Sequence, residues 1–595
     1  MCRIAGIIDN NRTHQEIKSD VKLMCNAMAH GGPDDEGLTL VNEHAVFGHR
    51  RLSIIDLTTA GHQPMTTEQF TISYNGEIYN YQTLKSQLLD LNFHFNTETD
   101  TEVILVGFKA WGPSLFTKLE GMFAFAIYDH QRQETFLVRD QMGIKPLYYS
   151  AEKDQLIFSS EVKAFSKTAY SFPENEDWKV YFLAFGHIPH PFTTLKNVYA
   201  LPGGTYLKWN HSDQTHQTNS FISGKTEKTI THPEEANASI EKELAHAVQK
   251  HLISDAPIGV FLSGGIDSSI LTLLANEKVG NRLNTLSINF VEEAFSEEKY
   301  QKIISDRIDG KHSSYRVTEK DFNDNFENIM TAMDQPTNDG INSWFVNKCA
   351  KENGLKAVLS GIGADELLGG YPSFKRMALI KSLKKLPKSI LKLSIHLPSD
   401  KLNRIYFLSY QNPVGEYLFL RGFFTPNMIS KILDQPQKKI DQLFEDFPFS
   451  ENIDELEGEE RAAWFETNLF MKNQLLKDTD FMSMSHGIEV RVPFLDQCFV
   501  DTTKKISKEN RFQIRPKGLL INAFKNILPE TIWNRPKMGF TFPLQQWFLS
   551  SGLITNERLY QNNNYNQKLI TKFKRGEMHW SKAFALYQVS VSTKI

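Results

Sequence analysis

The sequence predicts an α/β protein made of two domains. Its 595 residues are too many for one hydrophobic core, because single cores stop growing at about 250–300 residues. The first 207 residues hold short segments of strand-forming residues separated by polar or glycine-bearing turns. From residue 234 onward, strands alternate with helical segments, and this pattern predicts a parallel, doubly wound sheet.

The N-terminal half is predicted to be rich in strands. Clear strands are expected at 123–129, 135–140 and 155–160, and helices at 16–29 and 101–111. Sheets stacked between helices are the layered arrangement that such a pattern allows. We therefore expect one domain over residues 2–207.

A polar stretch rich in Thr, Ser, Gln and Asn follows, and it predicts a linker over residues 208–233. The second domain is then expected over residues 234–595, beginning with a helix that ends near 251 and becoming largely helical, as extra helices beside its sheet, after 374. Its strands are predicted at 258–262, 285–290 and 357–359.

Composition excludes several classes of function. A net charge of −4 gives no basic surface for nucleic acid. No apolar run approaches the ~20 residues that a membrane span needs, and the N-terminus lacks the apolar segment of a signal peptide. The four cysteines (Cys2, Cys25, Cys349 and Cys498) have neither metal-ligand nor disulfide spacing. Together these features predict a cytoplasmic protein with no membrane or nucleic-acid partner.

Cys2 is a candidate nucleophile because it follows the initiator residue. Met1 is normally removed before a residue as small as Cys, and removal would leave a thiol and a free α-amine on one residue. An α-amine titrates near ~7.7–8.0, so it can take the thiol's proton directly or through a water. The thiolate is the reactive form.

Residues downstream of Cys2 suit the hydrolysis of an amide that carries an amino-acid head group. Arg51 can bind the carboxylate of such a substrate, and Asp100 with Glu77 can bind its ammonium group. The Asn75 side-chain amide and the Gly76 backbone N–H can stabilise an oxyanion. Alternatively, Asn75-Gly76 is an ordinary hairpin turn, and both interpretations can hold together.

Over residues 2–205 this pattern resembles the class II glutamine amidotransferases, whose nucleophile is the N-terminal residue. The resemblance implies a four-layer αββα sandwich of the Ntn type and glutamine as a substrate. It also implies that Cys2, Asn75 and Gly76 are catalytic. The glutamine-binding residues that it implies are Arg51, Leu52, Ser53, Ile54, Ile55, Asn75, Gly76, Glu77 and Asp100.

The second half contains a loop of small residues, Ser263-Gly264-Gly265, between a predicted strand and a helix. Backbone N–H groups in such a loop, with the helix N-terminus, bind anions. The loop lacks the Walker pattern and resembles the pyrophosphate loop of ATP-pyrophosphatases. A second loop, Ser360-Gly361-Ile362-Gly363-Ala364-Asp365, follows another strand, so Asp267 and Asp365 are candidates to share Mg²⁺ bound to pyrophosphate.

Two further motifs, Arg491-Val-Pro-Phe-Leu-Asp496 and Arg535-Pro-Lys537-Met-Gly-Phe, are similar to signatures of the asparagine synthetase C-terminal domain. The resemblance makes Lys537 the catalytic lysine that neutralises phosphate charge, with Lys517 as a weaker second candidate. The ATP-binding residues that it implies are Leu262, Ser263, Gly264, Gly265, Asp267, Ser268, Ser269, Ile288, Ser360 and Gly361.

Taken over nearly the whole chain, the resemblance is to the glutamine-hydrolysing asparagine synthetase family. It implies that glutamine is hydrolysed at Cys2 and that the ammonia passes through the protein to an aspartyl-adenylate made from ATP. The expected substrates are glutamine, aspartate and ATP, with Mg²⁺ as the metal, and a homodimer is compatible with the resemblance.

Two positions depart from the family pattern. Gly31 in His30-Gly31-Gly32-Pro33-Asp34 stands where the family usually has Arg, so one cation near the glutaminase site is missing. Ile362 stands where asparagine synthetases usually place Glu, at a position that affects acyl-adenylate formation. Either Glu366, Asp334 or Asp339 replaces that Glu, or the pocket takes a different carboxylate.

Three other functions therefore stay open. The enzyme could amidate another carboxylate, such as a uronic acid of a surface polysaccharide or a peptide side chain. It could be a β-lactam-forming ligase, although such relatives typically lack the N-terminal Cys that this chain retains. A non-catalytic amino-acid sensor or scaffold is disfavoured because both sites keep their reactive groups.

Overall fold

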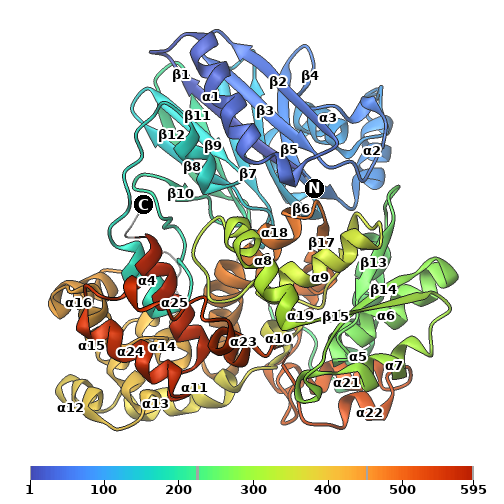
Figure 1. Ribbon diagram of the computed structural model, residues 1–595. Coiled ribbons are helices and arrows are strands. Elements are labelled where there is room, and N and C mark those ends of the chain that lie inside the picture. The colour runs from blue at the N-terminus through green and yellow to red at the C-terminus, as the bar shows by residue number, and fades with distance from the viewer. Residues whose placement is uncertain (1, 223–226, 450–452, 540, 593–595) are drawn as a thin grey trace.

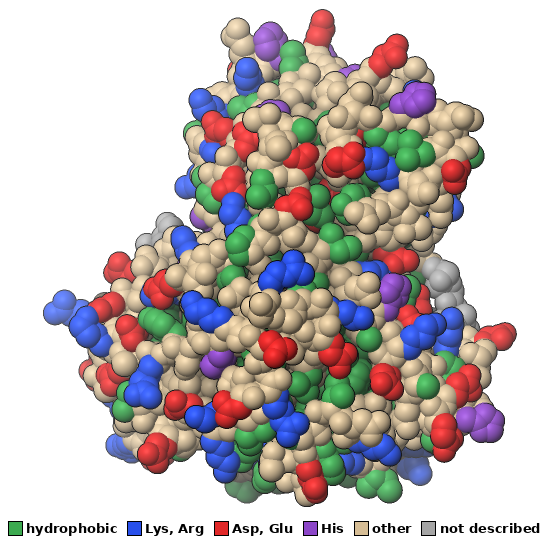
Figure 2. All heavy atoms as spheres, turned by 90° about the vertical axis from the view of Figure 1, so that its right-hand side faces the viewer, with side chains coloured by type: hydrophobic (Ala, Val, Ile, Leu, Met, Phe, Trp, Pro, Cys, Tyr) green, Lys and Arg blue, Asp and Glu red, His purple; other side chains and the backbone are tan. Residues whose placement is uncertain are grey.

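The computed structural model describes residues 2–222, 227–449, 453–539 and 541–592. In Figure 1 the N-terminal half forms an upper lobe of sheets, and the C-terminal half forms a broader lower body. The N-terminus lies between them, at the lower edge of the upper lobe. Figure 2 shows acidic and basic side chains interspersed over one face of both parts.

Two six-stranded antiparallel sheets form the upper lobe. The first has the order β10-β8-β9-β1-β3-β2 and comprises β1 (Arg3–Asp9), β2 (Asp35–Asn42), β3 (Ala45–Arg51), β8 (Tyr148–Glu152), β9 (Gln155–Ser159) and β10 (Tyr199–Ala200). The second has the order β12-β11-β7-β6-β5-β4 and comprises β4 (Met65–Thr66), β5 (Phe70–Ile78), β6 (Gly121–Asp129), β7 (Glu134–Arg139), β11 (Thr205–Asn210) and β12 (Thr215–Ser220).

Helices cover the outer face of each sheet, so the predicted αββα sandwich is confirmed. Helix α1 (His14–Ala27) packs on the first sheet, while α2 (Tyr81–Asp90) and α3 (Asp100–Trp111) pack on the second. Apolar side chains such as Ile4, Phe47 and Leu137 fill the space between the sheets. Thr13 and Glu16 form a capping box that fixes the start of α1.

The polar stretch predicted as a linker contains regular structure. Strand β11 extends to Asn210, and β12 lies wholly within the stretch and pairs with β11 at the edge of the second sheet. All six residues of β12 are exposed, which explains why the sequence shows no alternation of apolar and polar residues there.

The lower body is built on a five-stranded parallel sheet with the order β15-β14-β13-β16-β17. Its strands are β13 (Ile258–Phe261), β14 (Asn284–Phe290), β15 (Lys311–Val317), β16 (Ala357–Leu359) and β17 (Glu489–Arg491). Helices α5 (Pro233–His251), α6 (Ile266–Val279) and α21 (Gly518–Phe524) cover one face, and α9 (Ile341–Glu352) covers the other. The doubly wound prediction is confirmed, and the direction of winding changes between β13 and β16.

Most remaining helices form a separate mass beside the sheet (Figure 1). They are α8 (Glu319–Ala332), α11 (Pro372–Leu383), α12 (Lys388–Leu393), α13 (Asp400–Asn403), α14 (Pro413–Arg421), α15 (Pro426–Leu433), α16 (Gln437–Glu445), α17 (Gly458–Phe465), the π-helix η9 (Glu466–Leu475), α18 (Leu476–Met484), α23 (Leu544–Ser551), α24 (Asn564–Lys574) and α25 (Trp580–Ser592). Helices α7 (Glu298–Ser305), α10 (Ala364–Leu368), α19 (Gln497–Lys505), α20 (Lys508–Arg511) and α22 (Glu530–Trp533) instead pack with α5, α6 and α21.

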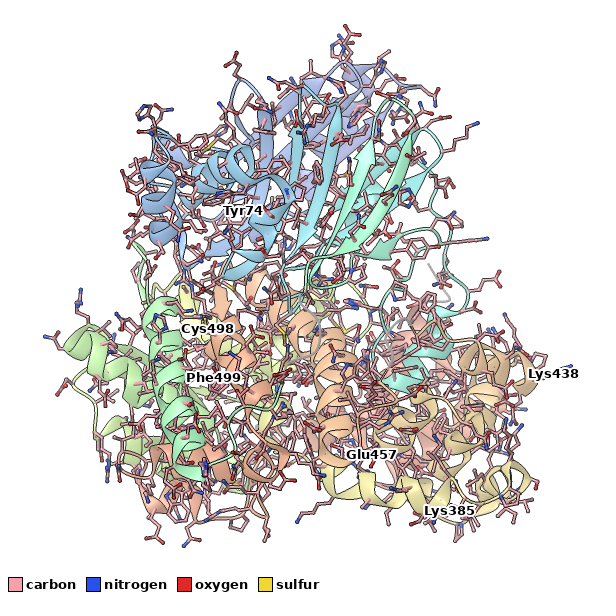
Figure 3. The ribbon with its side chains drawn as sticks, turned by 180° about the vertical axis from the view of Figure 1, so that it is seen from behind. Tyr74, Lys385, Lys438, Glu457, Cys498 and Phe499 are labelled. Atoms are coloured by element: carbon pink, nitrogen blue, oxygen red, sulfur yellow. The ribbon has the colours of Figure 1, made fainter. Side chains whose placement is uncertain are left out.

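One segment of the N-terminal half enters this helical mass. Helix α4 (Trp178–Phe185) packs in the same apolar core as α14, α15 and α25, so the two halves share buried surface. Lys385, after the end of α11, lies at the outer edge of the mass (Figure 3). Among the described helices, none is long and apolar enough to cross a bilayer.

Candidate active sites

Cys2 lies immediately before β1, at the junction between the upper lobe and the lower body. Its backbone N–H donates to Asn75 Oδ1 at 3.0 Å, which ties the first sheet to β5 of the second. The Cys2 side chain is buried, with Sγ 4.0 Å from the Leu52 carbonyl, and burial raises the pKa of its thiol. Met1 lies outside the described residues, so the predicted exposure of the α-amine stays a prediction.

Asn75 and Gly76 do not form a hairpin turn. Both lie within β5, paired with Ala124 and Phe123 of β6. A Cβ on Gly76 would lie only 2.2 Å from the Met122 carbonyl oxygen, so the close approach of the strands excludes any side chain. The alternative prediction of a turn was wrong. Glycine is needed at position 76 because the neighbouring strand β6 leaves no room for a side chain, and the chain does not reverse direction there.

Asn75 carries a free donor beside the nucleophile. Because Oδ1 accepts from the Cys2 backbone, Nδ2 is left facing away from that bond, and it is buried with no hydrogen-bond partner in the described part of the chain. A buried unpaired amide N–H is costly and needs an explanation. A donor held ready for an oxyanion provides one.

The segment predicted to bind glutamine, residues 51–55, follows β3 and meets the lower body. Arg51 is buried, and its guanidinium donates to the carbonyls of Thr58, at 2.7 Å, and Asp56. Leu52 and Ile54 pack against Ile258 and Ala357, at the start of β13 and β16. Ser53 is buried, and its N–H donates to Asp34 Oδ2 at 2.8 Å, whereas Ile55 is half-buried against the core beneath the second sheet.

Asp100 is held at the first turn of α3. Its Oδ2 accepts from the Tyr74 hydroxyl at 2.8 Å and from the Ile78 N–H at 3.1 Å; Figure 3 labels Tyr74 within the upper lobe. Burial raises the pKa of Asp100 to about 6, even though these hydrogen bonds oppose the shift. The carboxylate is therefore buried against β5, the strand that carries Asn75, where it could bind an ammonium group.

Glu77 faces charged groups of the other half that the sequence did not connect with it. Arg491 Nη2 lies 3.8 Å from Glu77 Oε2, and Arg491 Nε donates to Glu489 Oε1 at 2.5 Å. Burial and then the nearby Glu489 raise the pKa of Glu77 well above its usual value. The signature beginning at Arg491 thus lies at the junction between the halves, and only tertiary packing reveals that Glu489 belongs to this cluster.

The second candidate site lies at the carboxyl ends of β13 and β16, where the winding of the sheet reverses and where such folds bind ligands. The loop after β13 leads directly into the 14-residue helix α6, whose first-turn N–H groups point toward the loop. Gly264 has φ +81°, and Arg535 Nη2 donates to its carbonyl at 2.9 Å while the guanidinium stacks 3.7 Å from the Tyr300 ring centroid. This loop is therefore held in the strained conformation that only glycine adopts readily.

The other residues of this loop surround its turn. Ser263 and Ser268 hydroxyls lie 2.9 Å apart, and Ser269 Oγ is buried without a hydrogen-bond partner within the described ranges. The Leu262 N–H donates to the Leu286 carbonyl at 2.8 Å, and the Ser360 N–H donates to the Arg491 carbonyl at 2.8 Å. Ile288 lies buried on β14, the strand next to β13. Gly265 is the N-cap residue of α6. Gly361 lies directly against Asp267.

Asp267 and Asp365 are brought together by a buried lysine. Lys517 Nζ lies 2.5 Å from Asp267 Oδ2 and 2.7 Å from Asp365 Oδ1, and Lys537 Nζ lies 2.7 Å from the same Asp365 oxygen. Gly361 is needed here because its Cβ would lie 2.9 Å from Asp267 Cβ. Lys517, the weaker candidate from sequence, is thus the central cation, while Lys537 is half exposed.

The two carboxylates suit a magnesium ion that is bound mainly through phosphate. Asp267 Oδ1 is buried and makes no hydrogen bond to any described residue. Within the described ranges no group of three or more His, Cys, Asp or Glu side chains could hold a metal by itself. Mg²⁺ typically uses one or two carboxylates together with substrate phosphates, and the donor set of Asp267 and Asp365 fits that pattern.

Ile362 is half-buried and packs against the apolar core below the loop. Each of the carboxylates considered as its replacement already accepts hydrogen bonds from neighbouring groups. Glu366 accepts from the Gly363 N–H at 3.1 Å and the Tyr371 hydroxyl at 2.7 Å, and burial raises its pKa to about 7. Asp334 accepts from Val162 and Lys163 of the upper lobe, and Asp339 accepts from the Gly340 N–H.

Comparison with known proteins matches two successive parts of the chain to family models. A family model described as a glutamine amidotransferase domain matches residues 1–221, and one described as asparagine synthase matches residues 239–574. The chain belongs to the asparagine synthase family. It is a ligase-type protein with a glutamine amidotransferase domain, and its second domain is of a kind that uses ATP.

Relatives include asparagine synthetase [glutamine-hydrolyzing] 1 of Bacillus subtilis, which is 30% identical over 92% of this chain and 88% of its own. A putative asparagine synthetase of Methanocaldococcus jannaschii is 33% identical over 67% of this chain and 81% of its own. Amidase chry2 of Gibberella zeae is 26% identical over 92% and 90%. A solved phosphoribosylpyrophosphate amidotransferase of B. subtilis covers 53% of this chain and 81% of its own at 14% identity, but its TM-score of 0.30 is too low to carry an argument.

Proposed function

We propose that the protein is a glutamine-dependent asparagine synthetase. The observation that carries the proposal is the unpaired Asn75 Nδ2 beside Cys2, in a chain that also places Asp267 and Asp365 at a pyrophosphate-type loop. The first arrangement supports release of ammonia from glutamine. The second supports activation of a carboxylate by ATP.

In the proposed glutaminase reaction, the α-amine of Cys2 takes the thiol proton and the thiolate attacks the side-chain amide carbon of glutamine. Asn75 Nδ2 and the Gly76 N–H donate to the oxyanion, ammonia leaves with the transferred proton, and water hydrolyses the thioester to glutamate. Arg51 and Asp100, each held by hydrogen bonds, would bind the substrate's carboxylate and ammonium group.

At the second site, an oxygen of the aspartate side-chain carboxylate would attack the α-phosphorus of ATP and displace pyrophosphate. Asp267 and Asp365 would hold Mg²⁺, which when bound supplies positive charge to the pyrophosphate oxygens. Lys517 and Lys537 now pair with these carboxylates. When the carboxylates bind the metal, the two lysines could pair with the negative charge of the pyrophosphate instead. Ammonia then attacks the acyl carbon, AMP leaves, and asparagine forms.

Amidation of a different carboxylate is the second candidate, and Ile362 favours it. An apolar side chain packed on the core cannot accept a proton or bind an amine. Glu366, Asp334 and Asp339 already accept hydrogen bonds from Tyr371, Val162 and Gly340. The acceptor pocket would then be fitted to a uronic acid, a peptide side chain or another acid.

A substrate panel distinguishes the two candidates. With ATP, Mg²⁺ and glutamine present, AMP formation is measured for aspartate, uronic acids and other amino acids. Aspartate is expected to give the fastest turnover, and Ile362→Glu is compared with Ile362→Val to isolate the carboxylate at that position. No AMP from aspartate, with clear turnover of another acid, contradicts asparagine synthesis and supports the second candidate.

A further inference from the structure

Gly31, where the family usually has Arg, lies against the side chain of Arg3. A Cβ on Gly31 would lie 2.8 Å from Arg3 Cγ and 3.0 Å from Arg3 Nε. Gly31 does not have a positive φ, so its backbone does not require glycine. The Arg3 side chain, with Met484 Cε at 3.3 Å from the same point, therefore leaves no room for a side chain at position 31.

Arg3 is paired on both sides of the junction between the halves. Its Nε donates to Glu161 Oε1 at 2.6 Å, and its Nη2 lies 2.9 Å from Asp480 Oδ2. Glu161 follows β9 in the upper lobe, whereas Asp480 lies on α18 of the lower body. All three side chains are at most 3% exposed, so this is a fully buried cation between two carboxylates.

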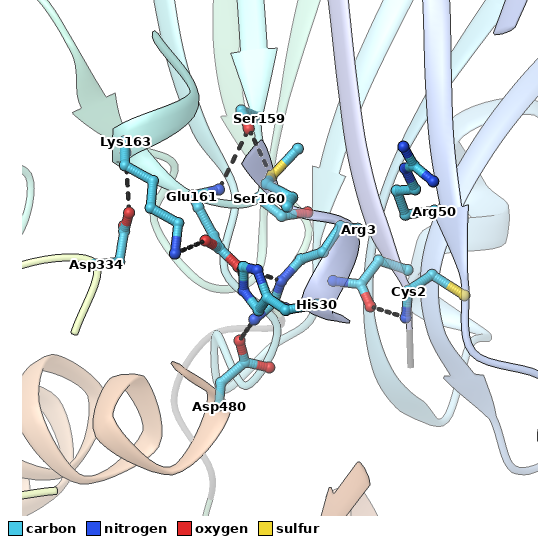
Figure 4. A network of polar contacts seen from close by, with 12 residues as sticks. Cys2, Arg3, His30, Arg50, Ser159, Ser160, Glu161, Lys163, Asp334 and Asp480 are labelled. Carbon is cyan, nitrogen blue, oxygen red and sulfur yellow. Dashed lines mark hydrogen bonds and ion pairs between the residues drawn. The ribbon is translucent and has the colours of Figure 1, made fainter. Parts of the chain in front are cut away.

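The cluster extends to His30 and Lys163, as Figure 4 shows. His30 Nε2 lies 3.0 Å from Glu161 Oε1, and Lys163 Nζ lies 2.8 Å from Glu161 Oε2. Burial would raise the pKa of Glu161, but Arg3 and then His30 outweigh that effect and hold the pKa well below its usual value. The site is therefore built around an ionised Glu161 and a charged Arg3.

A second carboxylate of the lower body holds the same loop. Asp334 accepts from the backbone N–H groups of Val162 at 2.7 Å and Lys163 at 2.9 Å. The loop after β9 is thus bound by Asp334 and, through Arg3, by Asp480. Neither contact involves the glutamine-binding candidates, so their role is distinct from substrate binding.

The place of Arg3 in the chain gives this cluster a consequence for catalysis. Arg3 is bonded directly to Cys2, and Figure 4 shows the two side chains running to opposite sides of the chain. Cys2 is fixed on its own side by the hydrogen bond to Asn75. The backbone of the nucleophile is therefore held between Asn75 and an ion pair to α18.

We propose that Arg3 is a positioning residue that replaces the missing cation of position 31 and, through Asp480, ties the Cys2 backbone to the synthetase half. Arg3 and Gly31 form an exchangeable pair, because the space between β1 and α18 accepts one arginine, from either position. The inference rests on the proposed function for the role of Cys2, and it does not depend on which carboxylate is amidated.

The test compares Arg3→Gly, Gly31→Arg and the double variant Arg3→Gly/Gly31→Arg with the wild type. Glutamate release is measured with and without ATP plus the best acceptor, together with the ratio of glutamate to AMP and the melting temperature. Arg3→Gly is expected to abolish stimulation by ATP and acceptor and to raise the glutamate-to-AMP ratio at least about threefold. Gly31→Arg alone is expected to lower the melting temperature because two arginines collide, and the double variant to restore both readouts to within about twofold of wild type.

Arg12→Gly is the matched control, because Arg12 pairs with Asp20 at 2.6 Å entirely within the upper lobe. It is expected to leave stimulation unchanged. If Arg3→Gly does not fold, Asp480→Asn removes the same link at nearly constant volume and is expected to give the same loss of stimulation. Retained stimulation in a folded Arg3→Gly or Asp480→Asn protein, or a double variant no better than the singles, overturns the proposal.

These outcomes are separate from a failure of the proposed function. Glutamate release and melting need no amide acceptor, so the exchange of Arg3 and Gly31 is measurable even if aspartate is not a substrate. A wild type that releases no glutamate contradicts the glutaminase assignment itself.

Discussion

The surroundings of Cys2 and of Asp267 differ in how their polar groups are paired. Beside Cys2, Asn75 is fixed through its Oδ1, which accepts from the Cys2 backbone, and its Nδ2 is left as a buried donor with no partner in the described part of the chain. Around Asp267 the carboxylates are neutralised by Lys517 and Lys537, so charges are already paired before any ligand arrives.

This difference indicates two ways of preparing for catalysis. The proposed glutaminase site is preorganised by strands, which fix Asn75 and Gly76 within β5, and stabilising an oxyanion there would need little rearrangement. The proposed pyrophosphate site lies on loops at the carboxyl ends of the strands, and its ion pairs would have to rearrange for metal and phosphate to bind. Variants at the two sites should therefore fail in different and separable ways.

The largest effect is expected from Cys2→Ala. Without the nucleophile, glutamine-dependent product should fall on the order of 10⁴–10⁶-fold, while synthesis from added ammonium salts continues. Cys25→Ala is the matched control, because Cys25 is a free cysteine on α1 that is buried in the core between this helix and the first sheet. Loss of the ammonium-dependent reaction in a folded Cys2→Ala protein contradicts the separation of the two sites.

The mirror-image result is expected for Asp267→Asn. Removing this charge at constant volume should lower pyrophosphate release about 10³-fold, because metal-borne charge stabilisation is worth several kcal/mol. Glutamine hydrolysis without ATP should stay near the wild-type rate. Asp306→Asn, an exposed change after α7, serves as the control. Equal pyrophosphate release in both variants identifies Asp267 as structural, with no part in holding a metal.

The same contrast explains what could be predicted from sequence. The layers of both domains follow from strand and helix patterns, and loops such as 262–265 are visible because glycine and serine follow a strand. Strand β12 was missed because it is polar throughout, and β15 and β17 because they are short or half-exposed.

Contacts between distant segments set the limit at the sites. Nothing in the local sequence places Glu489 beside Glu77, or Asp480 beside Arg3, because each pair joins residues more than 400 positions apart. The central place of Lys517 is equally a result of folding. The sequence showed that Gly31 stands where the family usually has Arg. It did not show that the side chain of Arg3 occupies the space beside Gly31.

A smaller effect, about 10²–10³-fold in glutaminase kcat, is expected for Asn75→Ala, which removes one oxyanion donor together with the oxygen that accepts from the Cys2 N–H. The KM for glutamine should change little, because the donor acts only when the oxyanion forms. Ser73→Ala is the control on the same strand, where it removes only a hydrogen bond to the Gly48 carbonyl. A change confined to KM would place Asn75 in substrate binding instead.

The smallest effect is a pH dependence set by Asp100. Burial raises its pKa to about 6, so the carboxylate that is proposed to bind the substrate ammonium becomes protonated as the pH falls through that value. The ionised fraction falls roughly fourfold between pH 7.5 and 5.5, and the KM for glutamine should rise by the same factor.

The sign for stability is opposite. Between the ordinary pKa of 3.8 and about 6, the folded protein holds this proton more tightly than the unfolded chain, so the contribution of Asp100 to folding improves as the pH falls. Asp100→Asn should therefore raise KM at pH 7.5, remove its variation with pH and flatten the dependence of the melting temperature over the same range. A wild-type KM that is constant from pH 5.5 to 7.5 would exclude Asp100 as the anion that glutamine contacts, and the preorganised site would then depend on Glu77 and Arg51.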